Sequence, residues 1–267
     1  MRPFRFGAVA GYAPTAEAWT GLARRAEQLG YSTLLVPDTL RTFSPFTAAA
    51  VAAQATTTLR VGTFVASAPY RSPAAIAWET STLHTLTGGR FELGIGAGRP
   101  GSEADSAALG LEFGTPGSRI ARVAETLDLV KDVPILIAAS GTKLLRLAAE
   151  RADIVALGVP VTTTEDQLGA KLDELYELAG DRFSELEITM NLAAVGDGSL
   201  PPWLAAQLGS DPNDVVAAGG TGILTGGTSE MIDTLRRRRD KLGISYISVN
   251  AQFMEQFAPV VKELAGT

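Results

Sequence analysis

Residues 58–101 read TLRVGTFVASAPYRSPAAIAWETSTLHTLTGGRFELGIGAGRPG and predict one complete strand–helix–strand unit. Leu59–Ala66 is largely apolar and rich in β-branched residues, which favours a buried strand. Pro73 predicts the start of a helix, since a proline at the first helical position loses no intrahelical hydrogen bond. Arg90–Gly96 then returns to a second buried strand. Because a helix joins the two strands, we expect parallel pairing and a right-handed crossover.

Both strands of this unit end in small residues. The first is followed by Ala66, Ser67, Ala68 and Pro69, and the second by Gly96, Ala97, Gly98 and Arg99. Small side chains at a strand end allow a flat ligand to approach the backbone closely. The stretch therefore predicts both a parallel sheet and a ligand site at its edge.

The same alternation continues along the whole chain. Strands are expected at Phe4–Ala10, Thr33–Val36, Leu59–Ala66, Phe91–Gly96, Pro134–Ala138, Ile154–Leu157, Leu186–Val195 and Ser245–Val249. Helices are expected at Thr15–Leu29, Pro45–Ala55, Pro73–Leu86, Ser118–Val130, Thr142–Arg151, Thr164–Ala179, Thr228–Leu242 and Met254–Leu264. Eight such units predict a closed α/β barrel, the (β/α)8 or TIM barrel, with an open doubly wound sheet as the alternative. We expect one domain over residues 1–267, because no linker, repeat or low-complexity run divides the chain.

Composition limits the classes of function. The chain has 23 Lys and Arg against 29 Asp and Glu, a net charge of −6, which disfavours nucleic acid or an anionic membrane as a partner. It contains no cysteine and one histidine, so a disulfide, a thiolate metal site and a cysteine nucleophile are excluded, and we expect no metal. No apolar run has the length of a signal peptide or a membrane span. The expectation is a cytoplasmic protein.

Four pieces of the chain resemble the bacterial luciferase-like flavin and deazaflavin oxidoreductases. They are AEQLGYSTLLVPD (residues 26–38), S-P-x(14)-GGRFELGIGAG (72–98), GDRFSELEI (180–188) and FAPVVKELAG (257–266). The last two resemble the branch that uses coenzyme F420. The resemblance implies an oxidoreductase that transfers a hydride between F420 and a small organic substrate, with an FMN-dependent monooxygenase as the alternative. It also implies a homodimer.

The resemblance places the ring of the cofactor at the end of the third strand. Aligned on Ser72 and Pro73, the non-proline cis peptide of the family falls between Phe64 and Val65 and would support the ring from behind. Ser67 would face the ring edge. The alternative is an ordinary trans strand end.

Asp38 and Thr39 follow the second strand and are the candidate catalytic residues. Asp38 would orient a cofactor or handle a proton; the alternative is an aspartate that caps local amides in a turn. In the deazaflavin relatives a histidine commonly follows this aspartate. The threonine here can form hydrogen bonds but cannot titrate near pH 7.

The loop after the fourth strand reads Gly96-Ala97-Gly98-Arg99-Pro100-Gly101, which satisfies the pattern G-x-G-x-x-G. It is weak evidence for dinucleotide binding, because it follows the fourth strand rather than the first. Within the resemblance, flavin-type relatives carry a phosphate-binding arginine at the position of Ala97, and deazaflavin relatives an acidic residue at that of Arg99. Neither feature is present. Arg99 is expected to bind an anionic group of cofactor or substrate, or else to form a surface ion pair.

Residues Ala139, Ser140, Gly141 and Thr142 lie between the fifth strand and its helix. Small residues there leave helix amides open to an anion, and the resemblance implies that they bind the cofactor phosphate, flanked by Gly158 and Val159. The alternative is capping by Ser140 or Thr142. A second glycine cluster, Gly219–Gly227, precedes Thr228 and keeps a phosphate-substrate isomerase or lyase open as a minor possibility.

Other polar features are expected to be structural. His84 lies in a helix, Glu92 and Glu103 form no credible carboxylate pair, and the basic run 236–239 should pair with Asp233 and Asp240 along its own helix. Thr39 and Arg99 depart from the family pattern, and a loop segment that relatives usually carry is missing at Lys131-Asp132. A degenerate barrel that binds ligand without turnover is therefore an alternative. Substrate contacts are expected near Tyr12, Phe43, Trp203 and Phe253, the third of which lies in an irregular loop, Gly196–Gly209.

Overall fold

The computed structural model describes residues 1–99, 101–196, 205–206, 209 and 211–267, and its strands close into a parallel barrel. The barrel strands are β1 (Arg5–Val9), β2 (Thr33–Val36), β3 (Arg60–Thr63) with β4 (Ala66–Ser67), β5 (Phe91–Gly96), β6 (Ile135–Ala139), β7 (Ile154–Leu157), β8 (Glu187–Leu192) and β11 (Ile244–Asn250). Each pairs in parallel with its neighbours, and pairing of β3 with β5 closes the ring. The predicted (β/α)8 barrel is confirmed.

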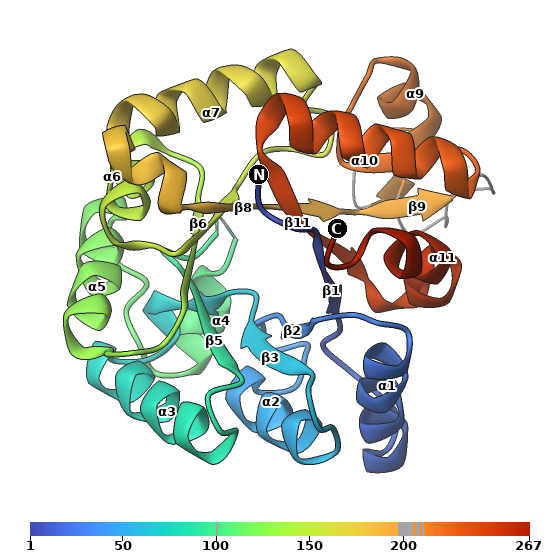
Figure 1. The fold of residues 1–267 in the computed structure, drawn as a ribbon. Helices are drawn as coiled ribbons and strands as arrows, with labels where there is room; N and C mark the ends of the chain where they lie inside the picture. The colour runs from blue at the N-terminus through green and yellow to red at the C-terminus, as the bar shows by residue number, and fades with distance from the viewer. Residues whose placement is uncertain (100, 197–204, 207–208, 210) are drawn as a thin grey trace.

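The predicted helices surround the barrel (Figure 1). They are α1 (Ala16–Gln28), α2 (Pro45–Gln54), α3 (Pro73–Leu86), α5 (Pro116–Leu129), α6 (Thr142–Arg151), α7 (Glu165–Ala179), α10 (Thr228–Leu242) and α11 (Met254–Leu264). Their starts follow the local sequence: Thr15 accepts a hydrogen bond from the amide of Ala18, and Ser72 accepts one from the amide of Ala75. Two short helices, α4 (Glu103–Ala108) and α9 (Pro212–Ala217), were not predicted.

Two predicted strands are divided. Leu59–Ala66 is interrupted between β3 and β4, where Phe64 and Val65 belong to neither strand. Leu186–Val195 was expected to be continuous, but β8 ends at Leu192 and the chain continues as β9 (Ala194–Gly196). β9 leaves the barrel and pairs with β10 (Ile223–Thr225) in a separate two-stranded sheet, joined by a hydrogen bond from the amide of Ala193 to the carbonyl of Gly222. A run of apolar residues cannot show this break, because both sheets bury the same kind of side chain.

An ion network fills the barrel interior near the amino-terminal ends of the strands. The Arg5 guanidinium lies 2.8 Å from carboxylate oxygens of both Glu92 and Glu187, and Arg60 Nε donates to Glu92 at 2.5 Å. Arg5 also lies over the Tyr246 ring, 3.7 Å from its centroid. Glu92 is thus bound to arginines and not to Glu103, as expected. Because these side chains occupy one end of the barrel, the other end is left for a ligand.

Most of the apolar core lies between the barrel and its helices, and a smaller cluster lies inside the barrel around Leu35, Leu136 and Tyr246. Within the described residues, no helix is long and apolar enough to cross a bilayer. Trp203 and most of the predicted loop Gly196–Gly209 lie outside the described residues.

Candidate functional site

A cavity of about 800 Å³ opens at the carboxyl ends of strands β2, β4, β5, β6 and β7. It brings together most of the residues predicted from sequence: Asp38, Thr39, Phe64, Val65, Ser67, Gly96, Ala97, Gly98, Arg99, Ser140, Gly141, Thr142 and Gly158. Two predicted residues are not part of the lining. Ala139 is fully buried in the core at the end of β6, and the half-buried Val159 packs against that core. The Ala139 side chain points away from the cavity because strand residues alternate in direction, and the preceding Ala138 lines the cavity instead.

One wall of the cavity is the break between β3 and β4. The peptide between Phe64 and Val65 is cis, as the aligned position predicted, and both side chains line the cavity. The glycines of β5 make room for this wall. A Cβ atom on Gly96 would lie 2.9 Å from Val65 Cγ2, and one on Gly94 only 2.0 Å from the carbonyl oxygen of Thr63. These glycines therefore serve backbone packing first, and ligand access follows from it.

Asp38 is held in an ion pair and is not a free base. Its Oδ2 atom accepts hydrogen bonds from Arg71 Nη1 at 2.6 Å and from the amide of Ser67 at 2.9 Å. Its Oδ1 atom accepts from Arg71 Nη2 at 3.3 Å. The amide that this carboxylate binds lies on a different strand and not in the turn of Asp38 itself, so this bond differs from the expected capping of local amides. Proton handling by Asp38 is disfavoured, because both of its carboxylate oxygens already accept hydrogen bonds from Arg71 or Ser67.

A second carboxylate lies on the other side of Arg71. Arg71 Nε is 3.4 Å from Glu79 Oε2. Burial raises the pKa of Glu79 above its ordinary value; Arg71 opposes this increase, and the charge of Asp38 adds to it. Sequence analysis missed both Arg71 and Glu79, since the spacing between Asp38 and Arg71 follows neither a helix nor a strand period.

Thr39 belongs to a local turn at the cavity rim. The amide of Thr39 donates to Thr42 Oγ1 at 3.3 Å, and Thr42 Oγ1 donates to the carbonyl of Thr39 at 2.8 Å. His84, the single histidine, lies away from the cavity on α3, with Nδ1 3.4 Å from the carbonyl oxygen of Phe91. Among the described lining residues there is thus no histidine, cysteine or tyrosine.

The first turn of α6 is uncapped and faces the cavity. Its N-cap residue is Gly141, which has no side chain to accept from the turn, and a Cβ atom built there would meet nothing within 4 Å. The Thr142 hydroxyl donates instead to Glu174 Oε1 at 2.8 Å, so the alternative of capping by Ser140 or Thr142 is wrong. Lys143, which was not predicted, adds a cation to the same turn. Uncapped amides, the helix dipole and a lysine together form a site for an anion.

Two arginines line the cavity beside the end of β5. Arg99 was predicted to bind an anion or to form a surface ion pair, and no ion pair involves it in the described part of the chain. Arg119, on α5, was missed. Its Nε atom donates to the carbonyl of Ala97 at 2.7 Å and its Nη1 atom to the carbonyl of Gly114 at 2.8 Å. No motif marks Arg119, because it comes from a helix and meets the loop only in the folded chain.

Residues 1–133 match the family model described as luciferase-like monooxygenase. This chain belongs to the luciferase-like monooxygenase family. It is 39% identical over 116 residues to 4-hydroxyprotoasukamycin monooxygenase of Streptomyces nodosus subsp. asukaensis, an alignment that covers 41% of this chain but only 29% of that protein. It is 29% identical to an F420-dependent glucose-6-phosphate dehydrogenase of Nakamurella multipartita, over 71% of this chain and 67% of that protein.

The fold of this luciferase-like chain also matches solved structures. The coenzyme F420 dependent tetrahydromethanopterin reductase from Methanopyrus kandleri superposes with a TM-score of 0.74, covering 98% of each chain at 17% identity. An identity this low supports the fold alone.

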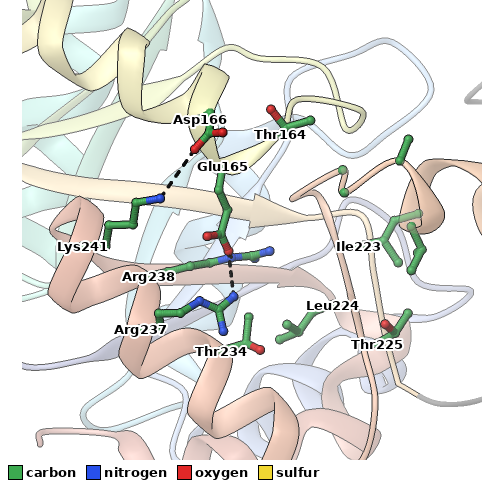
Figure 2. Close-up of a pocket in the computed structure, with 14 residues that line it drawn as sticks. Thr164, Glu165, Asp166, Ile223, Leu224, Thr225, Thr234, Arg237, Arg238 and Lys241 are labelled. Atoms are coloured by element: carbon green, nitrogen blue, oxygen red, sulfur yellow. Dashed lines mark hydrogen bonds and ion pairs between the residues drawn. The ribbon is translucent and has the colours of Figure 1, made fainter.

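A second pocket of the luciferase-like chain, about 450 Å³, lies between the start of α7, β10 and α10 (Figure 2). It contains part of the glycine cluster 219–227, on which the alternative function of a phosphate-substrate isomerase or lyase depended. The amide of Gly227, which precedes α10, donates to Glu230 Oε2 at 2.8 Å, so a carboxylate of the chain itself already lies at this helix start. β10 is also outside the barrel, and the geometry gives no support to that alternative.

The basic run of the luciferase-like chain is ion-paired, as expected, but mostly with other helices. Glu165 Oε1 on α7 accepts from Arg237 Nη2 at 2.8 Å and from the buried Arg238 Nε at 3.1 Å (Figure 2). Arg236 lies 3.7 Å from Glu263 on α11. The predicted pairs of Arg237 with Asp233 and Arg236 with Asp240 are wrong, because carboxylates on neighbouring helices come closer.

Proposed function

We propose that this chain binds a deazaflavin of the coenzyme F420 type and transfers a hydride between it and a small organic substrate. The observation that carries the proposal is the cavity at the barrel mouth, which joins an apolar wall at Phe64 and Val65 to an anion site at the first turn of α6. Its volume, about 800 Å³, lies in the range of cofactor sites. A sequence relative named as an F420-dependent glucose-6-phosphate dehydrogenase supports the same cofactor.

The residues present fit a flavin-type group. Ser67 Oγ is buried and has no hydrogen-bond partner in the described part of the chain, although its residue lines the cavity. A buried hydroxyl without a partner is costly, so a polar ring edge placed beside it would supply the missing bond. The open space beside Gly141 leaves room for a phosphate at the α6 amides and Lys143.

When bound, the deazaflavin supplies the redox chemistry, accepting or donating a hydride. The chain itself would position the ring beside Phe64–Ser67 and hold the phosphate at Gly141–Lys143, with Gly158 beside it. We propose that Asp38 and Thr39 face the reactive edge. Asp38 would act by fixing the Ser67 amide, through the bond of 2.9 Å, while Thr39 offers a hydroxyl.

An FMN-dependent monooxygenase is the second candidate, and the relative named 4-hydroxyprotoasukamycin monooxygenase favours it. A barrel that binds ligand without turnover is the third, because Thr39 stands where deazaflavin relatives carry histidine. Both cofactors would use the same wall and the same anion site.

Titration of the purified protein with F420 and with FMN, followed by fluorescence and visible absorbance, tests the proposal. We expect saturable binding of F420 that is tighter than that of FMN. No spectral change with either cofactor would refute the proposal. Reduced cofactor mixed with a generic acceptor then separates an enzyme from a binder, since a binder saturates without oxidising the cofactor.

We also propose that the chain forms a homodimer through the outer faces of α2 and α3. These adjacent helices expose Thr47, Val51, Gln54, Trp78, Thr82, Thr85 and Leu86, none of which is charged. Trp78 and Leu86 are 75% and 76% exposed. A neutral, partly apolar face is self-complementary and suits a second copy of the chain. Light scattering of the wild type and of Trp78→Glu tests this: the wild type should be dimeric and the variant monomeric. A monomeric wild type would contradict it.

A further inference from the structure

The cavity carries an excess of positive charge. Its described lining contains three cations, Arg99, Arg119 and Lys143, and one carboxylate, Asp38. Because Arg71 neutralises Asp38 at 2.6 Å, no described residue of the lining supplies a counter-charge to the three cations. The chain as a whole has a net charge of −6, so this concentration of cations is local. A cavity of this kind raises the local concentration of anionic ligands.

Arg119 is fixed in place by carbonyl oxygens and an aromatic ring. Two of its nitrogens donate to the carbonyl oxygens of Ala97 and Gly114, and its guanidinium lies 4.2 Å from the centroid of the Phe113 ring. The residue is half-buried, and no carboxylate pairs with it in the part of the chain that the structure describes. A partly desolvated guanidinium is stabilised by an anion, and the fixed planar group is preorganised to bind a carboxylate or phosphate.

The pocket in Figure 2 shows the contrasting arrangement. There, Arg237 and Arg238 share Glu165, and Lys241 Nζ lies 3.6 Å from Asp166 Oδ1. Each cation in that pocket already has an acidic partner, so no anion is needed from outside. Arg119 differs because its bonds use carbonyl oxygens, which leave its positive charge uncompensated.

Arg119 and Lys143 lie at different parts of the cavity rim. Arg119 is tied to the loop after β5, and Lys143 belongs to the helix after β6. We propose that Arg119, with Arg99, forms a second anion subsite, which takes a carboxylate or phosphate group other than the one bound at the first turn of α6. This inference rests on the proposed function, in which the α6 turn holds the cofactor phosphate. The second anion has two possible sources: a further acidic group of the cofactor, or an anionic substrate.

The test compares Arg119→Gln, which removes the charge, with Arg119→Lys, which keeps it. Both variants lose the paired bonds to Ala97 and Gly114, so a purely structural role would affect them equally. Arg122→Gln is the matched control, because Arg122 also lies on α5 and donates to a loop carbonyl, that of Glu112 at 2.9 Å, but does not line the cavity. Circular dichroism and thermal unfolding confirm that each variant folds.

Calorimetric titration is run with inorganic phosphate on the free protein, with F420, and with inorganic phosphate on the F420-saturated protein. On the free protein, Arg119→Gln should weaken phosphate binding about tenfold or more, the effect of losing one charge-assisted hydrogen bond. Arg119→Lys should retain most of the affinity, and Arg122→Gln should match the wild type.

The remaining titrations identify the source. If the cofactor fills the subsite, Arg119→Gln lowers F420 affinity by a similar factor, and saturating F420 abolishes the Arg119-dependent phosphate binding. If the substrate fills it, F420 affinity is unchanged and phosphate still binds to the saturated protein through Arg119. Equal losses in the Gln and Lys variants, or no difference from Arg122→Gln, would overturn the subsite. Failure of F420 and FMN to bind would overturn the proposed function alone, because the phosphate titration of the free protein stands by itself.

Discussion

Arg71 binds the Asp38 carboxylate through two nitrogens, at 2.6 and 3.3 Å, and so connects the end of β2 to the segment that precedes α3. Asp38 in turn accepts from the Ser67 amide in β4. This pair fixes two adjacent rim loops at the wall where the ring is proposed to bind.

Arg71→Ala should therefore destabilise the protein and weaken cofactor binding. Removing one partner of a buried pair leaves the 6% exposed Asp38 side chain charged and uncompensated, with an expected loss of about 3 kcal/mol. Urea unfolding measures this loss. The double variant Arg71→Ala, Asp38→Asn should recover part of the stability; a double variant no more stable than Arg71→Ala would contradict this explanation.

Glu27 should make stability depend on acid pH. Burial opposes its ionisation, but bonds from the amides of Thr58 and Leu59, the Thr58 hydroxyl and the amide of Thr57 outweigh burial and lower its pKa from 4.5 to about 2. The folded state therefore binds fewer protons than the unfolded state between these values. The stabilisation is complete above about pH 4.5 and is lost as the pH falls towards 2.

Glu27→Gln tests this by denaturant unfolding at several pH values. Near pH 7 the variant should be less stable by about 1–3 kcal/mol, the usual effect of losing hydrogen bonds to a charged group. The difference from the wild type should shrink as the pH falls from 5 towards 2. A difference that stays constant over this range would show that ionisation of Glu27 is not responsible.

Gly96→Ala should disturb the cavity wall. The added Cβ would lie 2.9 Å from Val65 Cγ2, so the Val65 side chain has to shift, with an expected cost of about 1–3 kcal/mol and weaker F420 binding. The control is Gly169→Ala in α7, where the nearest atom would be 3.7 Å away. That change should be neutral or stabilising by up to about 1 kcal/mol. Unfolding and F420 titration of both variants provide the comparison.

Lys143→Gln should reduce binding of the phosphate group specifically. We expect F420 affinity to fall about tenfold, while the affinity for its deazaflavin riboside, which lacks the phosphate, is unchanged. Arg146→Gln is the control, because Arg146 is an exposed cation on the same helix that does not line the cavity. Equal losses for the two ligands would place the phosphate elsewhere.

The barrel could be predicted because its signals are local. The apolar pattern indicates the strands at Leu59–Ala66 and Arg90–Gly96, and Pro73 indicates the start of the helix between them. The helix and the second strand agree closely with the structure, whereas the first strand is interrupted between β3 and β4. The break between β8 and β9 could not be predicted in this way. It depends on a bond between Ala193 and Gly222, and these residues are distant in sequence.

By itself, the sequence determined the alternation of strands and helices and the small residues at the strand ends, since short-range periodicity and backbone freedom fix both. Only the tertiary structure decided the charges of the site. It paired Asp38 with Arg71, bound Arg119 to carbonyl oxygens and to no carboxylate of the described residues, and directed Thr142 towards Glu174. The physical reason is that an ionic interaction depends on distance in space, and closing the barrel brings together residues whose separation along the chain carries no period.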